Sequence, residues 1–272
     1  MPAGIRYLDG PRLSGAVIAA ANWVAAGREE INRINVFPVP DGDTGTNFSL
    51  TLRSVADALR TLGDASLPDT NRTLAQAAVL GARGNSGMML AQFLLGFTEA
   101  LGQTPTATAS DLAAAMTRGA ERLYQSLDDP REGTIITVAR EAAAAAQPSA
   151  QQTGDIRELM RRLLEGAEAA LARTPELMPL LKEAGVVDAG GKGFVRMLEG
   201  VMRHVNGDAP VTEPADELES GASAPAAMVD VAAERDYQYC TEVLVRGPAL
   251  PGSPGPVAHG ELKTARSFGS RR

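Results

Sequence analysis

Cysteine, histidine and aromatic residues are all scarce in this chain of 272 residues. A single cysteine, Cys240, excludes a disulfide framework within the chain and is typical of a reducing compartment. Aromatic residues make up only 4% of the sequence, so a core must be built mainly from alanine, leucine, valine and methionine. Because alanine, leucine and methionine are strong helix formers, this composition favours helices.

Long apolar runs and an excess of positive charge are also absent. The longest apolar stretch, residues 15–27, is shorter than the roughly 20 residues that cross a membrane. The first residues lack the basic and apolar segments of a secretion signal. The formal net charge of -7 argues against a nucleic-acid partner, which would require a basic face. We therefore expect a cytoplasmic protein with no membrane span and no nucleic-acid partner.

Apolar residues recur at helical spacing through most of residues 1–205, as in the stripe Phe48, Leu52, Val55, Leu59 and Leu62. No convincing strand interrupts this pattern. We predict an all-α domain of about eight helices around one core, with Ser110 as an N-cap. The predicted helical pieces cover residues 13–34, 47–62, 73–82, 86–101, 110–127, 133–146, 155–173, 175–185 and 188–205.

The composition changes after residue 205, which sets the predicted end of a domain spanning residues 5–205. Residues 206–236 are rich in proline, alanine, serine and acids, and we expect a flexible linker there. Residues 237–247 alternate apolar and polar side chains like the first strand of a further domain. Residues 248–272 are rich in proline and glycine, and we expect them to be disordered.

Two aspartates, Asp41 and Asp43, lie one residue apart in NVFPVPDGDTGTN, residues 35–47. Two such charges repel each other unless a cation lies between them. Magnesium fits this pair because it uses few carboxylates and fills its other positions with water and substrate phosphates. A calcium EF-hand loop fails, since Thr46 and Leu52 stand where it requires glycine and glutamate. The structural alternative is that Asp43 only caps a helix starting near Thr44.

Two glycine-rich turns, GARGNSG at residues 81–87 and DAGGKGF at residues 188–194, each open a predicted helix. Glycines allow close approach of a ligand, and a helix N-terminus attracts anions. Each turn alone also fits an ordinary helix connection. Neither matches a phosphate loop or a dinucleotide fingerprint, because no strand precedes either. Together with the acidic loop, the turns favour a site for Mg-nucleotide on a helical scaffold.

Four motifs occur in order: NVFPVPDGDTGTN, GARGNSG, EGTIITVAREAA and GVVDAGGKGF. Over residues 5–205 this series resembles the DhaL-type nucleotide domain of dihydroxyacetone kinases, and more closely the N-terminal kinase domain of bacterial fatty acid kinase. The resemblance implies an antiparallel barrel of eight helices that binds ATP and magnesium, with two ions, at one end. The segment YQYCTE, residues 237–242, resembles the opening of the middle domain of the same kinase. We therefore expect a chain truncated soon after that point.

The resemblance also assigns roles to individual residues. It implies that Asp41 and Asp43 are metal ligands and catalytic residues. Asn35 stands one residue out of step with a third aspartate of dihydroxyacetone kinases, so either its amide oxygen or a water takes that place. Nucleotide contacts are implied for Thr44, Gly45, Asn47, Gly84, Asn85, Ser86, Gly87, Gly133, Thr134, Asp188, Gly190 and Gly191.

The expected reaction is phosphoryl transfer from Mg-ATP to a fatty acid that a separate binding protein presents, which yields an acyl phosphate. A dihydroxyacetone kinase-type subunit is one alternative. The other, from a different class, is a truncated protein that binds Mg-nucleotide without turnover. The full-length family implies a homodimer, whose contacts we expect the missing domains to support.

Overall fold

The computed structural model describes residues 4–211 of the chain. Within this range the strand-like pairing is limited to one isolated antiparallel bridge between Leu8 and Ala107. Eight helices are long: α1 (Gly10–Ala26), α3 (Thr44–Leu62), α4 (Leu67–Gly81), α5 (Gly84–Leu101), α6 (Ala109–Gln125), α7 (Ile135–Gln152), α8 (Ile156–Ala172) and α11 (Ala189–Asn206). Three helices are short: α2 (Arg28–Arg33), α9 (Thr174–Leu177) and α10 (Pro179–Ala184).

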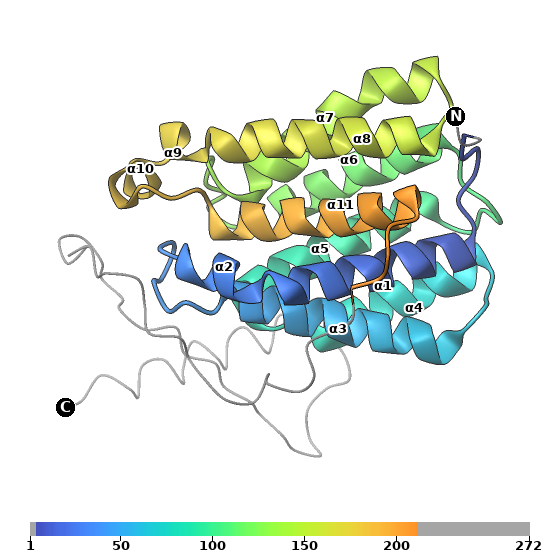
Figure 1. The fold of residues 1–272 in the computed structure, drawn as a ribbon, viewed down its shortest axis with the longest axis horizontal. Coiled ribbons are helices and arrows are strands. Elements are labelled where there is room, and N and C mark those ends of the chain that lie inside the picture. Colours follow the sequence, from blue (N-terminus) through green and yellow to red (C-terminus); the bar gives the residue numbers. More distant parts are fainter. Residues whose placement is uncertain (1–3, 212–272) are drawn as a thin grey trace. The chain divides into compact units, whose positions relative to one another are not determined.

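The eight long helices form a closed ring. Each packs against the next one along the chain, α8 packs against α11, and α11 closes the ring on α1. Successive long helices run in opposite directions, so α3, α5, α7 and α11 all begin at the end of the ring where α2, α9 and α10 lie (Figure 1). The prediction of an all-α antiparallel barrel of eight helices is confirmed.

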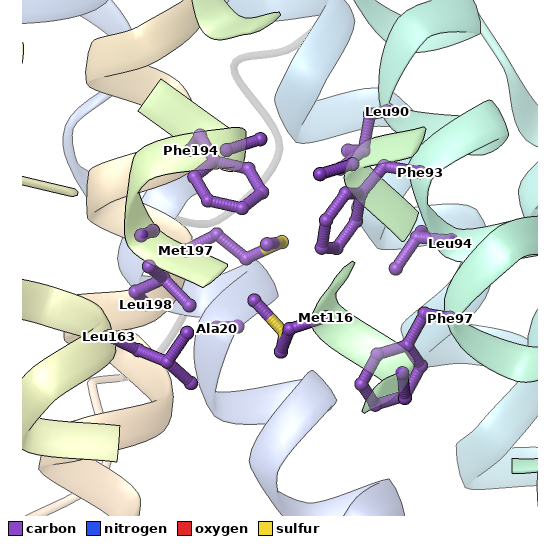
Figure 2. Packing of buried hydrophobic residues seen from close by; sticks show 14 of the residues in the cluster. Ala20, Leu90, Phe93, Leu94, Phe97, Met116, Leu163, Phe194, Met197 and Leu198 are labelled. Atoms are coloured by element: carbon purple, nitrogen blue, oxygen red, sulfur yellow. The ribbon is translucent and has the colours of Figure 1, made fainter. Parts of the chain in front are cut away.

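The inside of the ring is filled by buried phenylalanine, leucine, isoleucine, valine and methionine side chains, which pack among alanines. Phe93 of α5 and Phe194 of α11 meet edge to face, with ring centroids 4.9 Å apart (Figure 2). An apolar cavity of about 270 Å³ lies among these helices, and its lining includes Phe97, Met116 and Met197. Within residues 4–211, no helix is both long enough and apolar enough to cross a bilayer.

Some local predictions were wrong. The helix expected over residues 175–185 is divided at Met178, which ends α9 and precedes α10. The helix expected over residues 13–34 breaks at Gly27, which ends α1 and precedes α2. A side chain at Gly27 would overlap the guanidinium of Arg196, so the break follows from packing against α11. The N-cap of α6 is Thr108 rather than Ser110, because Thr108 and Asp111 form a capping box.

The predicted strand at residues 237–247, the predicted disordered tail at 248–272 and Cys240 lie outside the described residues. So does most of the predicted linker, of which residues 206–211 are described. The domain boundaries therefore stay predictions.

Candidate functional site

The predicted site segments gather at one end of the barrel. The acidic loop leads into α3, and the other three segments stand at the starts of α5, α7 and α11, which lie at the same end (Figure 1). None of the predicted site residues lines the apolar cavity, whose polar lining residues are Arg12 and His204. The candidate site is therefore separate from the cavity.

In the acidic loop, Asn35 holds the carboxylate of Asp41. The Asn35 Nδ2 donates to Asp41 Oδ1 at 2.7 Å and to the Val39 carbonyl at 3.3 Å. Asn35 is only 6% exposed, and its Oδ1 has no hydrogen-bond partner. Gly42, between the two aspartates, has a φ of 68°, a left-handed conformation that favours glycine. The turn thus orders Asp41 through a buried amide whose oxygen is unsatisfied.

These residues fit a hard divalent cation. No cluster of three or more His, Cys, Asp or Glu suited to a metal ion occurs in residues 4–211. The oxygen-bearing side chains of the loop are those of Asp41 and Asp43 and the orphaned amide oxygen of Asn35. Magnesium commonly binds through one or two carboxylates and completes its shell with water and phosphate oxygens. A buried oxygen without a partner is unfavourable, and a nearby cation would satisfy it.

Asp43 occupies the N-cap position of α3, but its side chain makes no capping hydrogen bond. The capping role that the sequence left open for Asp43 is therefore not seen. Asn32 of α2, which sequence reasoning missed, binds the first turn of α3 instead: its Oδ1 accepts from the Thr46 N–H at 3.1 Å. Asn32 lies three residues before the acidic loop and 14 residues before Thr46, and no local pattern in the sequence indicated this contact.

The start of α5 packs tightly on α3. Side chains at Gly84 and Gly87 would overlap Asn47 and Thr51, so glycine is needed at both positions. The Arg83 N–H donates to Thr51 Oγ1 at 3.1 Å, which fixes the turn on α3. At this turn the Oγ of Ser86 is buried without a partner. Thr44 and Gly45 are buried in the first turn of α3, and Asn85 is exposed.

The starts of α7 and α11 are joined by a buried carboxylate. Asp188 is 4% exposed and accepts a hydrogen bond from the Gly191 N–H at 2.7 Å. Burial raises the pKa of Asp188 to about 6, although hydrogen bonds from the Gly191 and Ile135 N–H groups oppose this shift. The buried Asp188 carboxylate therefore binds N–H groups at the starts of both helices.

The neighbouring predicted residues are also engaged within the protein. The Thr134 hydroxyl donates to the Arg131 carbonyl at 2.7 Å and accepts from the Ile136 N–H at 3.4 Å. Gly133 has a φ of 82° and packs beside Leu177. Gly190 lies over Asp188, since a Cβ there would be 3.2 Å from Asp188 Oδ2. The predicted contacts of these residues with a nucleotide stay predictions.

Lys192, which follows the glycines at the start of α11, forms a salt bridge with Glu30 of α2. Its Nζ lies 3.0 Å from Glu30 Oε1, and Arg196 approaches the other oxygen of Glu30 at 3.3 Å. The hydrogen bond from Lys192, above all, lowers the pKa of the Glu30 carboxyl. This cluster joins α2 to α11 at the candidate site.

The described part of the chain is thus an all-helical domain, a closed ring of eight long antiparallel helices with an acidic loop and glycine-rich helix starts at one end. The chain belongs to the DAK2 domain family, which matches residues 38–203.

Two relatives cover most of this chain. Protein YloV of Bacillus subtilis is 38% identical over 247 residues, which are 89% of this chain and 45% of YloV. A protein of Staphylococcus saprophyticus is 38% identical over 245 residues, 89% of this chain and 44% of that relative. The chain thus spans less than half the length of these relatives.

One similar solved structure is the dihydroxyacetone kinase from C. freundii in complex with AMP-PNP and Mg²⁺. The TM-score is 0.53 at 18% sequence identity, and the match covers 70% of this chain and 33% of that chain. At this identity the likeness shows a shared fold.

Proposed function

We propose that this chain is an ATP-dependent kinase domain that transfers a phosphoryl group from Mg-ATP to a fatty acid presented by a separate binding protein. The observation that carries the proposal is the presence of two orphaned buried oxygens, Asn35 Oδ1 and Ser86 Oγ, on two of the predicted site segments. Seven buried side-chain nitrogen or oxygen atoms of residues 4–211 have no hydrogen-bond partner, and a bound ligand would satisfy the two that lie on these segments. The C. freundii kinase of the same fold was crystallised with AMP-PNP and Mg²⁺, which supports the same ligand class here.

In this proposal Asp41, Asp43 and the amide oxygen of Asn35 hold magnesium, with two ions in the complete site. Bound magnesium supplies neutralisation of the phosphate charge and Lewis-acid activation of the phosphoryl group. The N–H groups at the start of α5, with Asn85 and Ser86, orient phosphate oxygens, because a helix N-terminus favours anions. Asp188 keeps the starts of α7 and α11 in place around the nucleotide.

The chemistry of proton transfer supports the choice of acceptor. The sequence holds two histidines, of which His204 lies in the last turn of α11 and borders the apolar cavity rather than the acidic loop. A fatty acid carboxylate is already ionised at neutral pH and attacks phosphorus without losing a proton. A hydroxyl acceptor such as dihydroxyacetone requires a base. This difference favours the fatty acid.

Two other functions are the alternatives. A dihydroxyacetone kinase-type subunit is favoured by the fold shared with the C. freundii enzyme. The alternative from a different class is a protein that binds Mg-nucleotide without turnover.

The test supplies the full chain with Mg-ATP and either a fatty-acid-binding protein loaded with oleate or a dihydroxyacetone-binding subunit loaded with its ketone. Acyl phosphate is trapped with hydroxylamine, and ADP release is followed in both reactions. Hydroxamate formed only with the oleate carrier supports the proposal. ADP release only with the ketone supports the dihydroxyacetone kinase, and ATP binding with neither product supports the protein without turnover.

A further inference from the structure

The three most exposed large apolar side chains of residues 4–211 all flank the connection between α4 and α5. Leu80 is 81% exposed, Met88 is 52% exposed and Val79 is 51% exposed. Val79 and Leu80 lie in the last turn of α4, and Met88 lies near the start of α5. None of the three belongs to the core, so the packing of the ring does not account for them. Exposed apolar side chains that gather in one place mark an interaction surface.

Together with Arg83, these side chains form the α4–α5 surface, which is free of acidic residues. Residues 70–98 cover most of both helices and are the longest stretch of the sequence without aspartate or glutamate, although the chain has 33 such residues. Arg83 is exposed, and its Nη1 donates to the Ala82 carbonyl at 3.1 Å. Among the described residues, no carboxylate pairs with Arg83. The surface is therefore apolar and carries one positive charge that is not neutralised.

The other turns at this end of the ring, where α4 ends and α5 begins, carry exposed carboxylates (Figure 1). These are Asp41 before α3, Asp128 and Asp129 before α7, and Glu176 and Glu183 on α9 and α10. A partner with carboxylates of its own would be repelled by those turns and attracted to the α4–α5 surface. Charge thus favours an acidic partner at this one part of the rim.

The α4–α5 surface also adjoins the proposed phosphate contacts. Asn85 and Ser86 lie between Arg83 and Met88 in the sequence, and the Ser86 Oγ is buried without a partner. The Arg83 N–H donates to Thr51 Oγ1 at 3.1 Å, which holds this turn on α3. A molecule that brings an acceptor to a phosphate at Ser86 would therefore meet Arg83 and Met88.

We propose that the α4–α5 surface is the docking site of the fatty-acid-binding protein, which contacts Leu80 and Met88 with apolar side chains and Arg83 with a carboxylate. The identity of this partner rests on the proposed function. Methionine and arginine are enriched in protein–protein interfaces, and exposed apolar side chains gain free energy when a partner covers them. A second copy of the chain fits less well, because a two-fold contact centred here would bring the two Arg83 guanidinium groups together.

The first test measures binding of the full chain to an oleate-loaded fatty-acid-binding protein by surface plasmon resonance, without nucleotide. Leu80→Glu and Met88→Glu should each weaken binding about tenfold or more, because each replaces an apolar contact with a charge that repels the partner's carboxylate. Leu62→Glu is the matched control and should bind like the parent, since Leu62 is 36% exposed and ends α3 at the opposite end of the ring (Figure 1). A parent that does not bind this protein, or surface variants that bind it like the parent, would overturn the proposal.

The role of Arg83 is tested through ionic strength. Arg83→Gln should slow association and make it less dependent on salt, whereas Arg83→Lys should keep the salt dependence of the parent. The same salt dependence in Arg83→Gln and in the parent would remove Arg83 from the docking site.

A second measurement separates docking from chemistry. In the hydroxylamine assay, Leu80→Glu should raise the KM for the loaded carrier about tenfold and leave kcat unchanged, because docking binds ground state and transition state alike. Its ATP affinity, measured by titration calorimetry without the carrier, should equal that of the parent. Carrier binding that depends on Leu80, without acyl phosphate from any variant, would contradict the proposed function and support the docking site. Acyl phosphate formation with an unchanged KM in Leu80→Glu would overturn the docking site alone.

Two other occupants of the surface have readouts of their own. Sedimentation velocity of the parent detects a second copy, and co-sedimentation with phosphatidylglycerol vesicles detects a membrane. If Leu80→Glu abolishes either association and leaves carrier binding intact, the surface belongs to that occupant and the proposal is wrong.

Discussion

Asp188 and Gly191 are joined by a 2.7 Å hydrogen bond in which a buried carboxylate accepts from the N–H of the turn that opens α11. The same carboxylate accepts from the Ile135 N–H of α7. One ionisable side chain therefore holds two of the four helix starts at the candidate site, and its protonation is linked to stability.

Asp188 should make the protein more stable as the pH falls from about 6 to about 4. Its folded pKa of about 6 lies above the unfolded value of about 3.9, so the folded state binds the proton more tightly. The stabilisation is full below the unfolded pKa and is lost as the pH rises through the folded pKa. Its size is about 3 kcal/mol.

The urea midpoint of the parent should rise as the pH is lowered between these values. The midpoint of Asp188→Asn should lack this rise. If the midpoints of the parent and Asp188→Asn change with pH in the same way, the raised pKa of Asp188 is wrong.

Asp41→Ala and Asp43→Ala should each weaken Mg-dependent ATP binding by about 100-fold or more, since even outer-shell partners of a metal change affinity by about 10- to 100-fold. Far-UV circular dichroism should stay unchanged, because neither side chain belongs to the core. Asp64→Ala, at an exposed position after α3, is the charge control and should bind like the parent. Parent-like nucleotide affinity in both site variants would exclude the metal role.

Ser86→Ala should stabilise the ligand-free protein and weaken ATP binding. The Ser86 Oγ is buried without a partner, so its removal relieves a desolvation penalty of about 1 kcal/mol. In the complex the hydroxyl would contact phosphate, and its loss should weaken ATP binding about fivefold. Thermal unfolding with and without Mg-ATP measures both effects.

Ser149→Ala is the matched control, because the Ser149 Oγ is also buried without a partner but belongs to the last turn of α7. Ser149→Ala should raise the unfolding temperature without changing the further rise that Mg-ATP produces. If Ser86→Ala also leaves that further rise unchanged, Ser86 does not contact the nucleotide.

The sequence predicted the helices well because the apolar stripes have the helical period. The antiparallel ring with the site at one end was implied by the resemblance to the DhaL-type domain, and the four segments share an end because alternate helices of the ring begin together. The break at Gly27 could not be read from the sequence, because Arg196, which fills the space beside it, comes from α11. The spacing of Thr108 and Asp111 indicates a capping box, so the N-cap of α6 could have been predicted at Thr108 rather than at Ser110.

The hydrogen-bond partners of the side chains were the least predictable part of the site. The spacing of Asp41 and Asp43 indicated a cation but left a helix cap open for Asp43. In the structure Asn32 binds the first turn of α3, and its contact with Thr46 exists only once α2 folds against α3. Likewise, the DAGG turn indicated an anion site, whereas burial directs Asp188 inward to the N–H groups of two helices.

Isothermal titration of the full chain with ATP, in the presence and absence of magnesium, tests the central claim most directly. We predict binding that requires magnesium and disappears in Asp41→Ala. Absence of ATP binding under both conditions, or equal binding by the parent and Asp41→Ala, would contradict the account.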